Sequence, residues 1–116
     1  MIKREITNGR ISSTSLGFER GVFLTAWIYI DHTGGGQGFG GYVLKIEDKP
    51  NEFDFCGEFL QNVLSTVGVE KWEDLVGKYV RIDYDNSKIH RIGNIIKEVC
   101  LVIFFLMFLK VTWIKN

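Results

Sequence analysis

The chain has 116 residues, of which 46% are hydrophobic and 14% aromatic, so it can bury one core and is too apolar to be a disordered tail. Lysine plus arginine and aspartate plus glutamate number 14 each, which gives a net charge of zero. This balance argues against binding through bulk positive charge, so we expect no DNA or RNA partner. The length of the chain predicts a single domain over residues 1–116.

The cysteine pattern and the N-terminus bear on the compartment. Cys56 and Cys100 lie in apolar surroundings without metal-ligand spacing, so we read them as buried thiols rather than as a disulfide framework. No apolar segment follows the basic residues at the N-terminus, and we therefore expect no secretion signal. Together these observations predict a cytoplasmic protein.

Three antiparallel strands are predicted in the first part of the chain. Residues 11–18 form an extended segment rich in serine and threonine, and turn residues follow at 19–21. Residues 22–30 carry apolar side chains on both alternating faces, which is typical of a central strand or of one that meets another subunit. A glycine-rich loop over residues 34–41 then leads into a third strand at 42–46.

An amphipathic helix is predicted from Phe55 to about Val67, with Asp54 as its N-terminal cap. Phenylalanine and valine recur along it every four residues, at positions 55, 59, 63 and 67, so one face should pack on the sheet. Gly68 suits the left-handed residue beyond the helix end. A short helical turn follows at residues 72–75.

A hairpin is predicted next, with strands at residues 79–84 and 89–96 joined by the turn Asp85-Asn86-Ser87. Gly93 is the expected bulge within the second strand. Residues 47–74 are mainly acidic and residues 78–97 mainly basic. The two segments can pair with each other, or the basic one can form a local anion site.

The C-terminal segment contains an unbroken apolar run from Val99 to Leu109. A membrane-spanning helix needs about 20 apolar residues, so this run is short for one. The alternatives are a helix buried between subunits, a helix on the chain's own core and a membrane association. We favour the first, and predict an oligomer-interface helix within residues 97–116. The predicted fold class is α+β: an antiparallel β-sheet core, one amphipathic helix packed on it, and a C-terminal hydrophobic helix.

The glycine-rich stretch is the first candidate site. Gly36-x-Gly38-x-x-Gly41 matches the spacing of dinucleotide-binding loops, but those loops open a helix and here a strand is predicted to follow. Such a loop can still present backbone amides to a phosphate, with Phe39 or Tyr42 available to stack on a base. A subunit contact and an irregular turn are the alternatives.

The segment from His90 to Asn94 is the second candidate site. Arg91 is suited to bidentate contact with a phosphate, and Asn94 to a base edge or a ribose hydroxyl. Pairing of Arg91 with Asp83 or Asp85 across the hairpin is an equally good interpretation.

Catalytic residues are harder to assemble from this sequence. Cys56 with His32 or His90 could act as nucleophile and base, although a small apolar residue in the helix is the simpler interpretation of Cys56. The two histidines and two cysteines have no metal-ligand spacing. We therefore predict a protein that is not an enzyme and uses no metal and no cofactor.

Several segments together resemble one known family. They are Gln37-Gly38-Phe39-Gly40-Gly41-Tyr42, residues 59–75 with Val69-Glu70-Lys71-Trp72-Glu73-Asp74-Leu75 at their end, Gly77-Lys78-Tyr79-Val80-Arg81, and His90-Arg91-Ile92-Gly93-Asn94. Over roughly residues 11 to 97 the chain resembles the first type of Thoeris anti-defence proteins of phages, which are sponges for the signal made by bacterial TIR-domain enzymes. The tail departs from this resemblance, because an aromatic residue and Asp-Pro are expected where the chain has Val99 to Leu109.

The resemblance implies a phage protein of the host bacterial cytoplasm that binds a cyclic ADP-ribose-type nucleotide signal, glycocyclic ADP-ribose, without degrading it. It also implies a homo-oligomer, a dimer or a hexamer, with pockets where subunits meet and, in some members, a second site for cyclic oligonucleotides. No membrane partner is expected. Within the matching motifs we predict these ligand-binding residues: Gly36, Gln37, Gly38, Phe39, His90, Arg91 and Asn94. The alternative function is a phage inhibitor that binds a host protein complex through an apolar surface.

Overall fold

The computed structural model describes residues 4–21, 23–41, 45–46, 56–96, 99–104 and 107–112, with side-chain detail for 4–21, 23–41 and 57–96. In these ranges it contains strands, one α-helix and one short 3-10 helix. They are β1 (Glu5–Glu19), β2 (Phe23–His32), β3 (Gly35–Gly40), β4 (Lys45–Ile46), α1 (Cys56–Val67), η1 (Trp72–Asp74), β5 (Tyr79–Tyr84), β6 (Ile89–Gly93), β7 (Val99–Phe104) and β8 (Met107–Thr112).

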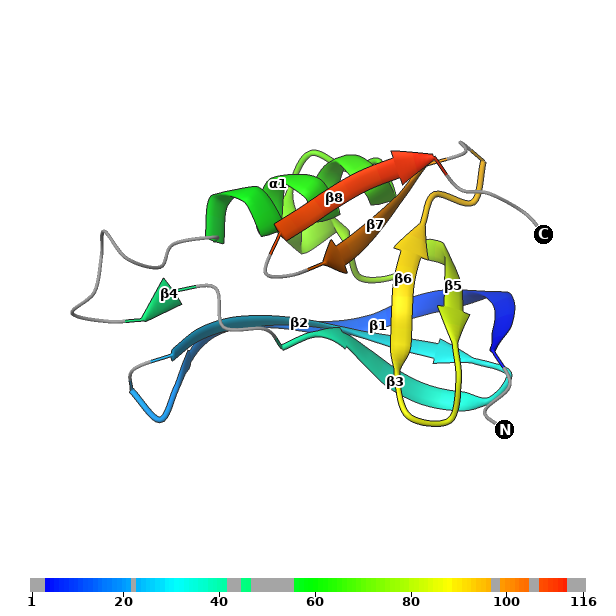
Figure 1. Ribbon diagram of the computed structural model, residues 1–116, viewed down its shortest axis with the longest axis horizontal. Helices are drawn as coiled ribbons and strands as arrows, with labels where there is room; N and C mark the ends of the chain where they lie inside the picture. Colours follow the sequence, from blue (N-terminus) through cyan, green and yellow to red (C-terminus); the bar gives the residue numbers. More distant parts are fainter. Residues whose placement is uncertain are drawn as a thin grey trace.

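The strands form one eight-stranded sheet in the order β3-β2-β1-β5-β6-β7-β8, with β4 also paired to β2. Every pairing between neighbours is antiparallel. The sheet is strongly curled: β1, β2 and β3 form one layer, α1 and the β7–β8 hairpin lie over it, and β5 and β6 connect the two (Figure 1). This arrangement confirms the predicted antiparallel sheet with a helix packed on it.

The curl originates in β1, which changes its partner along its length. Its first residues, Glu5 to Arg10, pair with β5, whereas Arg10 to Glu19 pair with β2. The register with β2 shifts between Ile11 and Ser13, as at a β-bulge, and bulges bend a strand and increase its twist. Because the two partners overlap on β1 only around Arg10 within the described registers, the two halves of the sheet are staggered and can fold toward each other.

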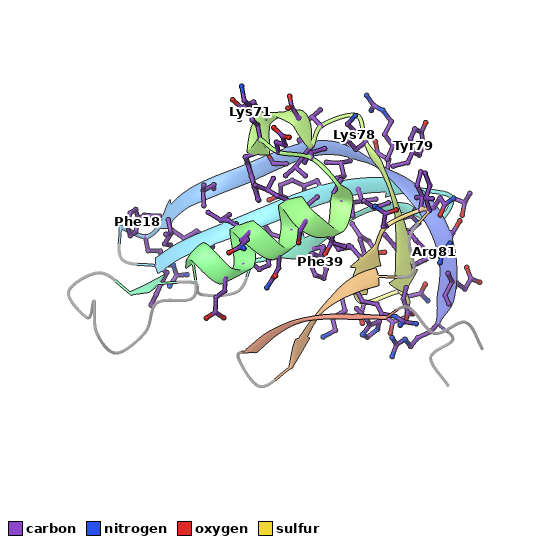
Figure 2. All side chains as sticks on the ribbon, turned by 90° about the horizontal axis from the view of Figure 1, so that it is seen from above. Phe18, Phe39, Lys71, Lys78, Tyr79 and Arg81 are labelled. Atoms are coloured by element: carbon purple, nitrogen blue, oxygen red, sulfur yellow. The ribbon has the colours of Figure 1, made fainter. Side chains whose placement is uncertain are left out.

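The core fills the space between the helix and the concave side of the sheet. Phe59 and Val63 of α1 are fully buried, and the ring of Phe39 on β3 stacks on Phe59 with centroids 6.4 Å apart. Figure 2 shows Phe39 beside the helix. The apolar face predicted from the four-residue repeat is therefore the face that packs on the sheet.

The end of α1 follows the prediction closely. Gly68 has a φ of 91°, and its N–H and that of Val69 both donate to the carbonyl of Leu64, at 2.8 and 3.1 Å. Both bonds go to one carbonyl of the last helical turn, where carbonyl groups lack partners within the helix. The predicted cap Asp54 lies outside the described residues.

The glycine-rich stretch was expected to be a loop, and this expectation is wrong. Residues Gly35–Gly40 form β3, which pairs with β2 from His32 to Trp27. A ladder of backbone hydrogen bonds needs no side chains, so glycine does not prevent pairing even though it is a poor strand former. Of the predicted strand at 42–46, the structure describes Lys45–Ile46 as β4; residues 42–44 lie outside the described residues.

The predicted C-terminal hydrophobic helix is also wrong. Val99–Phe104 and Met107–Thr112 are strands β7 and β8, which extend the sheet from β6 as a hairpin. A short apolar run rich in β-branched and aromatic residues fits a buried helix and a strand equally well by pattern, and the exposed edge of β6 favours a strand here. Within the described ranges, no helix is long and apolar enough to cross a bilayer.

The buried position of Phe39 leads to a first prediction. Phe39→Ala should lower the free energy of unfolding by about 3–5 kcal/mol, because it leaves a cavity beside Phe59. Phe18→Ala is the matched control, since Phe18 is 54% exposed whereas Phe39 is 1% exposed; its effect should stay within about 0.5 kcal/mol. Urea unfolding of both variants measures the difference, and equal losses would contradict the described core.

Candidate functional site

A cavity of about 410 Å³ lies between the edge of β3 and the turn that joins β5 to β6. Its volume lies in the range of small-molecule sites, which is about 300–1,000 Å³. The residues that line it come from β2, from β3 and its end, and from the turn: Trp27, then Gln37, Gly38, Gly40 and Gly41, then Ser87, Lys88 and Ile89. The cavity therefore joins part of the glycine-rich stretch to the hairpin that contains the second predicted motif.

The indole ring of Trp27 forms one wall and lies directly against the glycine backbone. A Cβ atom at Gly38 would come within 2.7 Å of Trp27 Cε3, and one at Gly41 within 2.0 Å of Cζ2. The ring also stacks on that of Tyr29, with centroids 5.8 Å apart and planes 13° apart. Glycine is needed at these two positions because any side chain would displace the indole.

Within the described part of the chain no strand pairs with the second edge of β3, and this free edge faces the cavity with backbone polar groups. Gly41 N–H donates to Ala26 O at 2.7 Å, and in an antiparallel pair the bonded pairs alternate with unbonded ones. Ile28 and Phe39, which are opposite each other, therefore exchange hydrogen bonds, whereas the N–H and C=O of Gly38 point away from β2. Gly38 thus presents a donor and an acceptor side by side at the cavity.

Gln37 joins this edge to the turn. Its Nε2 donates to the backbone carbonyl of Asp85 at 2.9 Å, and its Oε1 lies 2.8 Å from Nε2 of His32. Gly34 N–H donates to Nδ1 of the same imidazole at 3.0 Å, so the proton of the neutral ring is on Nε2, which donates to Gln37. Both ends of the Gln37 amide are therefore occupied, and the residue holds β3 and the turn at a fixed separation.

Asp85 organises the turn from within. Its Oδ1 accepts hydrogen bonds from the Ser87 hydroxyl at 2.6 Å and from the N–H groups of Ser87 and Lys88 at 2.8 and 3.1 Å. Its Oδ2 accepts from Nε2 of His90 at 2.6 Å. The bond from the Ser87 hydroxyl, followed by those from His90 and the Ser87 N–H, holds the pKa of Asp85 well below its ordinary value.

The bulge in this hairpin lies at His90 rather than at Gly93. Asp83 is opposite Arg91 and Tyr84 is opposite Ile89, so His90 is the extra residue of β6. A bulge re-aims the side chain of the extra residue, and here the imidazole turns toward Asp85.

Arg91 takes part in an ion-pair cluster on Asp83. Asp83 is 4% exposed and accepts hydrogen bonds from Arg91 Nε at 2.8 Å and from Arg4 Nε at 3.0 Å. Burial opposes the charged form of Asp83, but the hydrogen bonds from the two arginines, together with their charges, lower its pKa below the ordinary value. Of the two interpretations of Arg91, pairing across the hairpin is therefore present in the structure.

Asn94 connects the end of β6 to the end of the helix. Its Nδ2 donates to the carbonyls of Thr66 and Val67 at 3.1 and 3.4 Å, and its Oδ1 accepts from Ile96 N–H at 2.8 Å. These carbonyls belong to the last turn of α1, which needs partners from outside the helix. The amide of Asn94 thus acts here as a cap for the helix.

The structure brings only some of the predicted residues together. Gln37 and Gly38 line the cavity, Gly36 lies on the same strand, and His90 supports the turn through Asp85. The other three are placed elsewhere: Phe39 in the core, Arg91 on Asp83 and Asn94 at the helix end.

Six residues that line the cavity are not among the predicted ligand-binding residues: Trp27, Gly40, Gly41, Ser87, Lys88 and Ile89. A signal for Trp27 was present, because alternation along 22–30 places it on the face opposite to Ile28. It indicates a position beside the glycine residues only if the glycine-rich stretch is taken as the strand that pairs with β2. Ser87 and Lys88 follow from the position of the turn, but nothing in the sequence shows that this turn meets β3.

Comparisons of the chain with protein-family models, with curated proteins and with solved structures found no match.

The packing of Trp27 on glycine gives the second prediction. Gly38→Ala should lower the free energy of unfolding by about 1–3 kcal/mol, because the new methyl group overlaps the indole. Gly17→Ala is the control, since a Cβ atom there would meet nothing within 4 Å; it should be neutral or stabilise the fold by up to about 1 kcal/mol. If urea unfolding shows equal effects, the indole does not lie where it is described.

The lowered pKa of Asp85 gives the third prediction. Its pKa in the unfolded chain is about 3.9, so the ionised carboxylate stabilises the fold above about pH 4 and this contribution is lost as the pH falls further. Asp85→Asn should therefore be less stable than the parent at pH 7 and lose less stability between pH 5 and pH 2. Urea midpoints across this range test it, with Asp74→Asn as an exposed control that should follow the parent. A variant as acid-sensitive as the parent would exclude this role of Asp85.

Proposed function

We propose that the chain is a non-catalytic phage protein that sequesters a cyclic ADP-ribose-type nucleotide, glycocyclic ADP-ribose, and so blocks Thoeris immunity. The observation that carries this proposal is the cavity between β3 and the β5–β6 turn. It combines backbone donors and acceptors, an aromatic wall and a lysine in one hollow of small-molecule size. A nucleotide offers a matching set of groups: a flat base, hydroxyls and phosphates.

The aromatic wall supports binding of a base. The indole of Trp27 is partly buried, is held by the backbone of β3 and stacks on Tyr29, so it is fixed before a ligand arrives. Stacking of a base on an aromatic side chain is worth about 1–3 kcal/mol. A rigid wall also loses little conformational entropy on binding, which favours tight capture.

The turn supports binding of phosphate. Lys88 is exposed and lines the cavity, and an ammonium group binds phosphate oxygens as a point charge. The carboxylate oxygens of Asp85 accept hydrogen bonds from Ser87, from the Lys88 N–H and from His90, so they face these donors rather than the cavity. A small anion needs only a few cations, which is consistent with the zero net charge of the chain.

The connections of Ser87, Asp85 and His90 support binding without bond cleavage. These are the residue types of a hydrolytic triad, in which the serine donates to the imidazole and the imidazole donates to the carboxylate. Here Ser87 and His90 both donate to Asp85, at 2.6 Å each, so the serine hydroxyl is directed at the carboxylate rather than at the imidazole. Asp85 is itself a weak base because its pKa is lowered.

The fourth prediction tests capture directly. Protein incubated with the TIR-domain product and then separated from free ligand should release that product intact on heating. Lys88→Ala should bind about 10- to 100-fold more weakly, because a charge-assisted hydrogen bond contributes about 1.5–3 kcal/mol. Lys71→Ala is the matched control, since Lys71 is exposed and lines neither this cavity nor the groove beside the helix end, and it should capture as much as the parent.

Three outcomes would count against the proposal. Release of a degraded product would show that the protein is an enzyme. Equal losses in the two lysine variants would show that the ligand does not bind in this cavity, and no capture at all would contradict the proposed function.

A second candidate function rests on a different surface. A groove of about 450 Å³ beside the helix end is lined by apolar residues that include Tyr79, which is 56% exposed, and Ile96, which is 83% exposed. We propose that copies of the chain meet at this groove in the homo-oligomer. The second candidate function is that of an inhibitor that binds a host protein complex through the same groove. Native mass spectrometry reports the oligomer. A melting temperature that no nucleotide raises would favour the inhibitor, because a tight ligand stabilises the folded state by mass action.

A further inference from the structure

The open edge of β3 carries an inference about how a ligand is recognised. At Gly38 the N–H and the C=O both point away from β2, and this residue lines the cavity. Gly40, two residues further along the strand, also lines the cavity, but the φ of Gly40 is 113°, which departs from regular strand geometry. Gly38 is therefore the position at which the regular hydrogen-bonding pattern of a strand edge continues into the cavity.

Such an edge requires a partner with a donor beside an acceptor. In a sheet the next strand supplies both, and an extended peptide can do the same at a free edge. A nucleobase can also supply both, because adenine has an amino N–H next to a ring nitrogen that accepts. The free edge thus selects for ligands that carry these two groups side by side.

The geometry of the cavity favours a base over a peptide strand. The side chain of Gln37 crosses from β3 to the carbonyl of Asp85 at 2.9 Å, immediately beside Gly38. Because this bond holds the β5–β6 turn close to the edge of β3, a peptide strand pairing along β3 would meet the turn, whereas a base needs only the length of one residue. The indole of Trp27 adds an aromatic surface at the same point, packed against Gly38.

We propose that the backbone N–H and C=O of Gly38 bind the amino edge of an adenine base, pairing with the base as a neighbouring strand would. This inference rests on the proposed function, because it names the part of the nucleotide that the edge of β3 recognises. Recognition comes from main-chain atoms, and the aromatic wall of Trp27 covers a face of the base. The consequence is selectivity: a nucleotide whose amino edge is blocked is rejected.

The test uses three nucleotides that differ only in the base. AMP has the free amino edge, N6,N6-dimethyl-AMP lacks both amino hydrogens, and 3-deaza-AMP loses a ring nitrogen on the opposite side of the base. Each is titrated into ¹⁵N-labelled protein while the amide resonances are recorded. The amide of Phe39 is an internal control, because it is bonded to β2 and adjoins Gly38 in the same strand.

We expect AMP and 3-deaza-AMP to move the Gly38 amide proton downfield and the Phe39 amide proton less. N6,N6-dimethyl-AMP should bind roughly tenfold more weakly or worse, which is the discrimination that one good bidentate pair provides. Equal affinity for the dimethyl compound would overturn the inference, as would a Gly38 amide that millimolar AMP leaves unmoved.

The failure of this inference can be told apart from the failure of the proposed function. Capture and intact release of the TIR-domain product with no effect at Gly38 would leave the function standing and place the base elsewhere. Perturbation of Gly38 by AMP without capture of that product would keep the recognition of adenine and remove the proposed signal.

Discussion

The change of partner along β1 is the constraint on which the rest of the structure depends. One half of this strand pairs with β5 and the other half with β2, and the described registers overlap around Arg10. Two staggered half-sheets joined in this way curl, because each strand carries its own right-handed twist and the bulge adds to it. The curl places the free edge of β3 opposite the β5–β6 turn, although three strands, β2, β1 and β5, separate β3 from β6 in the order of the sheet.

A few polar contacts fix what the curl brings together. Gln37 spans from β3 to the carbonyl of Asp85, and the Asp85 carboxylate holds Ser87 and Lys88 in the turn. The same carboxylate binds His90, the bulged residue of β6. Because each of these donors favours the charged form of the carboxylate, the shape of the turn and the charge of Asp85 depend on each other. The cavity is thus bounded by a turn that is ordered before any ligand binds.

The sequence predicted those parts of the fold that depend on local pattern. The four-residue repeat identified α1, Gly68 identified its end, and the alternation at 79–84 identified β5. It failed where pattern is ambiguous. The glycine stretch has no side chains to alternate, so its strand is specified by the neighbouring β2, and the apolar run at Val99 to Leu109 fits a helix or a strand by composition.

Part of the lining of the candidate cavity could be predicted from the sequence, for the same physical reason. Composition pointed to Gln37 and Gly38, both of which line the cavity, because glycine in such density signals close approach of the backbone. It also pointed to Arg91 and Asn94, whose bonds to Asp83 and to the helix end depend on tertiary neighbours. Trp27 was missed because its significance arises from the strand beside it. Residues that act through a neighbour far away in sequence leave little local signal.

The glycines of β3 finally connect the fold to the proposed chemistry. The missing side chain at Gly38 lets the Trp27 indole pack on the backbone, and the unbonded position of the same residue leaves its N–H and C=O facing the cavity. A side chain there would displace the wall of the cavity and crowd its polar edge at once. The main-chain groups that we propose to bind the base belong to every amino acid, so no sequence motif marks them. What is particular to this chain is the geometry that, among the residues the structure describes, leaves one edge of β3 without a partner strand beside an aromatic ring.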